Sequence, residues 1–215
     1  MKSSKPFAFV LWVNDDRLPL YLVNRLSSMS HFGYLHYIRH KAEEPREQLI
    51  KRSTKEKPKP HYHCVVSFRK AMDYDNIILP LVMLWASTNK EYGDCPYTFM
   101  RTHEGKVNNI SSWLAYVIHH KDYMLYLERK HDKPETYKYE YSFNDIVSTD
   151  YDILEDQAHN TTSFISQCGE VLQRFDDAKE IGENSSTLSD ALSRCRTYSQ
   201  MIVAEKVYKA RRSDF

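Results

Sequence analysis

The chain has 215 residues, of which 41% are hydrophobic, and a formal net charge of +1. This length allows one large domain, or one domain with a smaller companion. A net charge so close to zero excludes a global field that attracts nucleic acid, so any DNA-binding surface must be a local basic patch. Four widely spaced cysteines without a C-x-x-C pair exclude a disulfide framework and a zinc ribbon. The N-terminus has no apolar signal core and no run of about 18 apolar residues occurs, so we expect a cytoplasmic protein without membrane contact.

The first half of the chain alternates between strand and helix patterns. An apolar strand at 7–13 and a second strand at 33–39 flank residues 18–29, whose apolar side chains recur at helical spacing. A third strand at 59–68, a helix at 73–87 that Asp73 would cap, and a strand at 96–102 follow. This order predicts an α+β fold, a ferredoxin-like βαββαβ sheet with helices on its faces. Many binding modules share that fold, so it does not name a function by itself.

The third strand carries a pair of histidines, in the sequence KPHYHCVVSF. Successive strand residues point to opposite faces, so His61 and His63 share one face. Two neutral imidazoles in this position can bind one cation. The alternative is two histidines without a function on an exposed strand face.

A third histidine, His40, ends the second predicted strand, and Glu43 and Glu44 follow it. If this strand lies beside the His61 strand, His40 and one of the glutamates would come close to the histidine pair. Three imidazoles and a carboxylate would suit Mn²⁺ or Mg²⁺ acting on a phosphate, and Zn²⁺ less clearly. An isolated His beside two Glu would otherwise be a solvated loop.

Residues 45–59 form a polar connection without apolar periodicity. It is either a solvated loop or a basic arm that contacts DNA phosphates. The candidate phosphate contacts are Lys51, Arg52, Lys55, Lys57 and Lys59.

A later helix, expected through residues 113–120 with capping residues at 108–112, contains Tyr116. On a helix Tyr116 would lie beside His119 and His120, three and four residues further on. A tyrosine among apolar neighbours is usually a core residue. However, a divalent cation that polarises a phosphate would allow a weak nucleophile such as a tyrosine hydroxyl to attack it.

Taken together, these motifs resemble a known family. The strand KPHYHCVVSF, preceded by His40 and Glu43 and followed by WLAYVIHHKD, is similar to the rolling-circle plasmid replication initiators of the HUH endonuclease superfamily with one catalytic tyrosine. The segment from Tyr116 to His119 is similar to their Y-L-x-H helix, and residues 132–139 to the K-x-x-Y segment that continues it. The resemblance covers roughly residues 5–142.

The resemblance implies a role for each matching residue. His40, His61 and His63 match the metal-binding histidines. Glu43 falls where the family commonly has Asp, so Glu44 remains a rival for the carboxylate ligand. Tyr116 matches the nucleophile that nicks single-stranded origin DNA and joins to its 5′-phosphate. Five later tyrosines lie outside the matching motif and are expected to pack or to stack on bases: Tyr123, Tyr126, Tyr137, Tyr139 and Tyr141.

The implied activity is metal-dependent nicking and joining of single-stranded plasmid origin DNA, and the implied partners are single- and double-stranded origin DNA. The chain has no Walker A motif, so a separate host helicase and polymerase would be needed. Histidine must be neutral to bind metal, so activity is expected to fall below about pH 6. A relaxase or transposase of the same superfamily is the near alternative. A non-catalytic ferredoxin-like nucleic-acid-binding module is the more distant one.

The composition changes after residue 144. Residues 1–144 are expected to form the catalytic and origin-binding domain, and residues 145–215 an acidic linker, over 145–157, followed by helices. The last helix would begin at 187–190 and include Cys195 and Tyr198. The resemblance implies a homo-oligomerisation role for this helical region, whereas the alternative is a helical cap on the catalytic domain.

Overall fold

The computed structural model describes residues 2–3, 5–13, 16–41, 60–90, 97–99, 105–131 and 139–213. The fold is α+β, and the chain forms two compact units. The first comprises Met1–Lys121 and Thr136–Ser163, and the second comprises Asp122–Glu135 and Phe164–Phe215. The expected boundary after residue 144 therefore falls inside the first unit.

The first unit is built on an antiparallel sheet with the strand order β6-β2-β4-β3-β7. Its strands are β2 Phe7–Leu11, β3 Phe32–His40, β4 His61–Phe68, β6 Tyr97–Phe99 and β7 Val147–Ser148. Each neighbouring pair is antiparallel. Two short strands, β1 Lys2–Ser3 and β5 Met72–Asp73, pair separately from this sheet.

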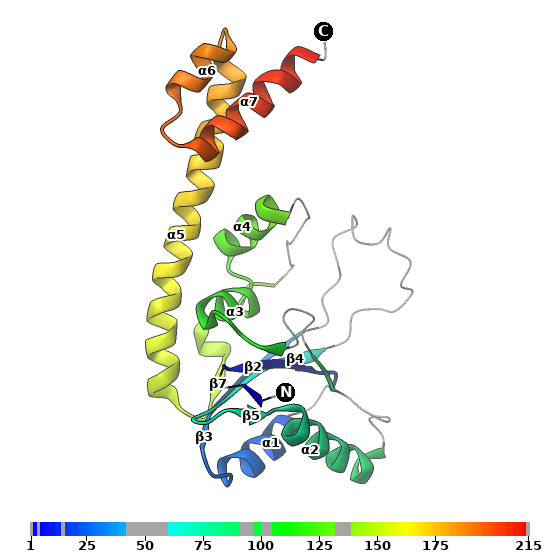
Figure 1. Cartoon of the computed structure of the whole chain (residues 1–215). Helices are drawn as coiled ribbons and strands as arrows, with labels where there is room; N and C mark the ends of the chain where they lie inside the picture. Colours follow the sequence, from blue (N-terminus) through cyan, green and yellow to red (C-terminus); the bar gives the residue numbers. More distant parts are fainter. Residues whose placement is uncertain are drawn as a thin grey trace. The chain divides into compact units, whose positions relative to one another are not determined.

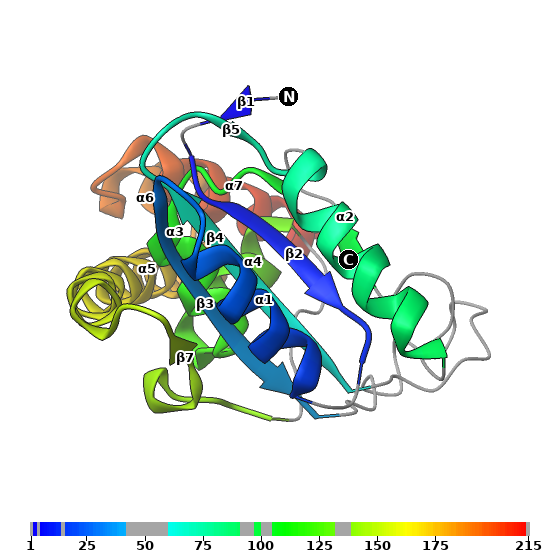
Figure 2. The same cartoon turned by 90° about the horizontal axis from the view of Figure 1, so that it is seen from below.

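Two helices cover one face of the sheet, as Figure 2 shows from that side. They are α1 Arg17–Ser27 and α2 Asp75–Thr88. In α1, the apolar side chains at helical spacing, Leu18, Leu22 and Leu26, are fully buried in the core against the strands. An amphipathic helix must bury its apolar stripe in this way, so the observed packing follows from the sequence pattern.

The opposite face is covered by α3 Ile110–Val117 and the beginning of α5 Tyr151–Asn184 (Figure 1). Trp113, Leu114 and Val117 of α3 and Leu154 of α5 belong to one buried cluster with side chains of the sheet. The side chain of Asn109 caps α3 by accepting a hydrogen bond from the backbone N–H of Ser112 at 3.2 Å. A cap of this kind contributes about 1 kcal/mol.

The expected acidic linker at 145–157 is structured instead. It contains β7, which pairs with β3, and the first turns of α5. The acidic composition does not indicate that Ile146 and Leu154 are buried, and these two side chains attach the segment to the first unit. The start of α2 also differs, because Asp73 pairs with Lys2 between β5 and β1 and Tyr74 is the N-cap residue.

The second unit contains most of α4 Lys121–His131, the remainder of α5, α6 Leu188–Arg194 and α7 Tyr198–Ser213. The single helix expected at the end of the chain is therefore two helices. They separate because the side-chain amide oxygen of Gln200 accepts hydrogen bonds from the backbone N–H groups of Arg196 (2.9 Å) and Thr197 (3.2 Å). The Thr197 hydroxyl in turn accepts from the backbone N–H of Gln200, so these residues begin a new helix.

In this unit α5 and α7 approach each other closely at Gly182. A Cβ at that position would lie 2.6 Å from the carbonyl oxygen of Ala204 and 2.9 Å from the Cβ of Val207. No helix in the described part of the chain combines the length and the apolar character that crossing a membrane requires.

Candidate metal centre

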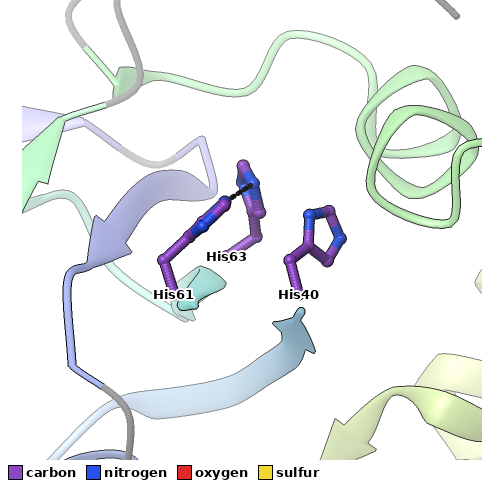
Figure 3. Close-up of side chains that lie close together, drawn as sticks. All are labelled: His40, His61 and His63. Atoms are coloured by element: carbon purple, nitrogen blue, oxygen red, sulfur yellow. Dashed lines mark hydrogen bonds between the residues drawn. The ribbon is translucent and has the colours of Figure 1, made fainter. Parts of the chain in front are cut away.

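Strand pairing brings three histidines together at one end of the sheet. In the register of β3 and β4, His40 lies opposite His61 and Ile38 lies opposite His63. Because side chains alternate between faces along each strand, all three imidazoles lie on the face that α3 covers. Figure 3 shows His61 and His63 rising from one strand and His40 from the end of its neighbour.

The geometry of this histidine cluster (His40, His61 and His63) fits a shared cation. One nitrogen from each ring can be chosen such that all three lie within 4.8 Å of one another, so the three side chains could hold a metal ion. The Nε2 atoms of His61 and His63 face each other at 3.0 Å (Figure 3). When each ring carries its proton on Nδ1, both Nε2 atoms offer a lone pair to the same ion. The Nδ1 atom of His63 is buried and has no hydrogen-bond partner among the described residues.

His40 is oriented by the backbone of α3. Its Nε2 lies 2.6 Å from the carbonyl oxygen of Val117, and a carbonyl can only accept, so Nε2 carries the proton. The tautomer fixed in this way leaves the Nδ1 lone pair available as a ligand. Metal-binding histidines are commonly oriented through such a hydrogen bond from the second ring nitrogen.

Burial favours the neutral form of two of the three histidines, His40 and His63. The pKa of His40 is lowered to about 3, chiefly by burial and next by the neighbouring His119. The pKa of His63 is lowered well below its ordinary value by burial and by the other histidines around it. Neutral imidazole is the form that binds metal, so these two side chains are ready to bind at neutral pH.

Two residues that the sequence did not assign to the site surround His40. The ring of Tyr141 stacks on His40, with centroids 4.6 Å apart and an interplanar angle of 4°. The Tyr141 hydroxyl accepts a hydrogen bond from the backbone N–H of Lys41 at 2.9 Å. His119, which is buried, lies with its ring centroid 4.5 Å from that of His40. Tyr141 therefore packs against another side chain, one of the two roles expected for the later tyrosines, and the side chain it packs against is a candidate metal ligand.

His119 does not continue α3 as expected. The helix ends at Val117, and His119 has a φ of 52°, in the left-handed region that non-glycine residues rarely adopt. Its Nδ1–H donates to the carbonyl oxygen of Tyr139 at 2.9 Å, and burial lowers its pKa to about 4. With this turn, the His119 ring lies beside His40.

Tyr116 lies on the last turn of α3, beside the cluster. Its ring centroid is 6.1 Å from that of His63 and 6.2 Å from that of His119, and the ring is nearly perpendicular to both. The side chain is half-buried. The Tyr116 ring thus lies beside His63, one of the three imidazoles that could bind an ion.

The remaining predicted site residues lie outside the described part of the chain. They are the candidate carboxylate ligands Glu43 and Glu44 and the candidate DNA contacts Lys51, Arg52, Lys55, Lys57 and Lys59. Residues 132–138, which carry most of the K-x-x-Y segment, also lie outside it.

Comparison with known proteins adds no assignment. No protein-family model matches the chain, and no curated protein matches it significantly. The site must therefore be interpreted from its own chemistry: three imidazoles that converge from two strands, with a tyrosine beside them.

Proposed function

We propose that this protein is a plasmid rolling-circle replication initiator, which nicks and rejoins single-stranded origin DNA through a covalent phosphotyrosine. The observation that carries the proposal is the proximity of Tyr116 to the histidine cluster, with 6.1 Å between the ring centroids of Tyr116 and His63. A hydroxyl nucleophile beside a cluster that could hold a metal ion is the arrangement that phosphoryl transfer requires. The strand order β6-β2-β4-β3 supports a ferredoxin-like arrangement of the first unit, since it joins the four strands of a βαββαβ chain in that fold's order.

His40, His61 and His63 would hold the ion, completed by a carboxylate from Glu43 or Glu44. A bound Mn²⁺ or Mg²⁺ would withdraw charge from the non-bridging oxygens of the scissile phosphate. Three nitrogen ligands favour Mn²⁺, because Mg²⁺ is usually bound through oxygen.

Tyr116 performs the covalent step. Its hydroxyl loses its proton as the oxygen attacks the phosphorus, the bond from phosphorus to the 3′-oxygen of the preceding nucleotide breaks, and that oxygen takes up a proton and leaves as a 3′-hydroxyl, so one proton passes overall from the phenol to the leaving oxygen. The bond energy is kept in the phosphotyrosine, so the 3′-hydroxyl can later attack it and rejoin the strand. The free 3′-end would prime synthesis by a host polymerase in the cytoplasm, with duplex origin DNA opened by a separate helicase.

A gel assay for the covalent adduct tests the proposal. We would incubate the protein with Mn²⁺ and a labelled single-stranded DNA pool with a randomised core, then separate the products under denaturing conditions. A DNA adduct that forms with Mn²⁺, disappears with EDTA and disappears in Tyr116→Phe is expected. The matched control is Tyr126→Phe, a tyrosine of α4 in the second unit, which should keep the adduct. An adduct that persists in Tyr116→Phe would refute the assignment of the nucleophile, and no adduct with any divalent ion would refute the enzyme.

A further inference from the structure

One large aromatic side chain beside the candidate metal centre is exposed. The chain has three tryptophans, and Trp85 and Trp113 are buried, at 5% and 6% exposure. Trp12, in contrast, is 47% exposed. Tryptophan is highly buried on average, so its exposure next to a site indicates a surface that contacts something else.

The sheet places Trp12 next to a candidate metal ligand. Leu11, the last residue of β2, pairs with Tyr62 of β4, so Trp12 follows opposite His61. The two rings are in contact, with centroids 4.6 Å apart and a tilt of 37°. Across this end of the sheet, Trp12, His61 and His40 lie side by side in that order.

We infer that Trp12 is a stacking platform for a base of single-stranded DNA, adjoining the phosphate that the histidine cluster would hold. This inference rests on the proposed function. An indole is uncharged and cannot bind a phosphate by charge, but it presents a wide π-face, and each of the four bases has one as well. Stacking of this kind is tolerant of sequence and is a common way for proteins to bind single strands. A base stacked on Trp12 would hold the neighbouring phosphodiester against His61 and orient it toward Tyr116.

The exposure pattern supplies a direct assay. Because Trp12 is exposed and the other two tryptophans are buried, quenching of intrinsic fluorescence by a bound base reports chiefly on Trp12. We would use the Tyr116→Phe variant in EDTA, which cannot cleave, and titrate it with an oligothymidine of about 16 nucleotides, the upper range of sites for such platforms. The control ligand is an abasic oligomer of the same length and charge.

We expect oligothymidine to quench the fluorescence and the abasic oligomer to leave it unchanged. Trp12→Ala should weaken binding of oligothymidine about 5- to 100-fold, measured by anisotropy of a labelled strand, and Trp12→Phe should retain most of the affinity. Trp85→Phe, which changes a buried tryptophan on the other face of the sheet, should keep the quenching. Unchanged affinity in Trp12→Ala, or equal quenching by the abasic oligomer, would overturn the inference. Tighter binding of an oligouridine RNA of the same length would overturn the assignment to DNA.

The adduct assay separates this inference from the proposed function. If Trp12→Ala forms the adduct with an unchanged dependence on DNA concentration, the platform is refuted and the enzyme stands. If oligothymidine quenches Trp12 but the wild-type protein forms no adduct, the platform stands and the enzyme is refuted. If both stand, Trp12→Ala should raise KM for the DNA by the same factor as it weakens binding, with kcat changed less.

Discussion

Acid should destabilise this protein through its buried histidines, and the effect can be worked out from the structure. Four of them have a lowered pKa, chiefly because of burial: His36 to about 4, His40 to about 3, His119 to about 4, and His63 well below its ordinary value. In the unfolded chain each would titrate near 6.5. Below that pH the unfolded state binds more protons than the folded state, so the free energy of unfolding falls as pH falls. The loss begins near pH 6.5 and continues until the folded-state pKa of each group is reached.

His36, His40 and His119, whose folded-state pKa lies at about 3 to 4, each cost about 1.4 kcal/mol of stability at pH 5.5 relative to pH 7.5. The three together cost about 4 kcal/mol, a large part of the stability of a typical domain, and the lowered pKa of His63 acts in the same direction. For a chain of this size, that loss lowers Tm by about 8 to 16 °C. The assay is thermal unfolding followed by circular dichroism at a series of pH values in EDTA.

His36 allows a test of this prediction away from the candidate metal centre. It is fully buried, stacks on Tyr34 with centroids 4.2 Å apart, and its Nδ1 has no partner among the described residues. His36→Phe keeps an aromatic ring there and should reduce the fall in Tm between pH 7.5 and 5.5 by about 3 to 6 °C. His159→Gln, an exposed position on α5, should keep the full fall. The reasoning is refuted if His36→Phe and wild type lose the same Tm over this range.

Three further predictions concern the site and the second unit. At pH 7.5, Mn²⁺ at one hundred times its Kd should stabilise the wild-type protein by about 2.7 kcal/mol in the same melting assay, and should not stabilise His63→Ala. Tyr141→Leu removes the ring stacked on His40 and should weaken Mn²⁺ binding, measured by calorimetry, about 10-fold or more, whereas Tyr141→Phe should change it little. Gly169→Ala, where an added Cβ meets no atom within 4 Å, should stabilise α5 by about 1 kcal/mol. Gly182→Ala gains the same helix propensity, but its added Cβ must push α7 away, so we expect a net loss of stability. Equal stabilisation by Gly169→Ala and Gly182→Ala would contradict the close approach of α5 and α7.

The histidine cluster could be predicted from the sequence because its geometry is mostly local. Strand alternation alone places His61 and His63 on one face. To bring His40 to this pair, the prediction needs only the further assumption that β3 pairs with β4. In the observed register His40 lies directly opposite His61. Strands joined in sequence commonly pair, so a single assumption was enough to bring the third histidine to the other two.

The surroundings of the cluster could not be predicted in the same way. The hydrogen bond between Lys41 and Tyr141 joins residues 100 positions apart, and no periodic pattern reports such a contact. The left-handed turn at His119 was missed because no glycine or asparagine marks the end of α3, which is the usual signal. The segment at 145–157 differs from its prediction for another reason: its acidic charges are typical of a linker, whereas its two buried apolar side chains, Ile146 and Leu154, attach it to the first unit.

Burial of the cluster also changes the expected pH dependence of metal binding. An exposed histidine site begins to lose affinity near pH 6.5, where protons compete for the ligand nitrogens. In the folded protein burial lowers the pKa of His40 and His63, so these two ligands stay neutral to lower pH than an exposed histidine would. Protonation of these two side chains should therefore contribute little to a loss of metal affinity between pH 7 and 6, and acid unfolding should add to the expected fall in activity below about pH 6. The same burial that keeps the imidazoles neutral for an ion thus makes the fold sensitive to acid, and an ion bound only by the folded state would offset part of that cost.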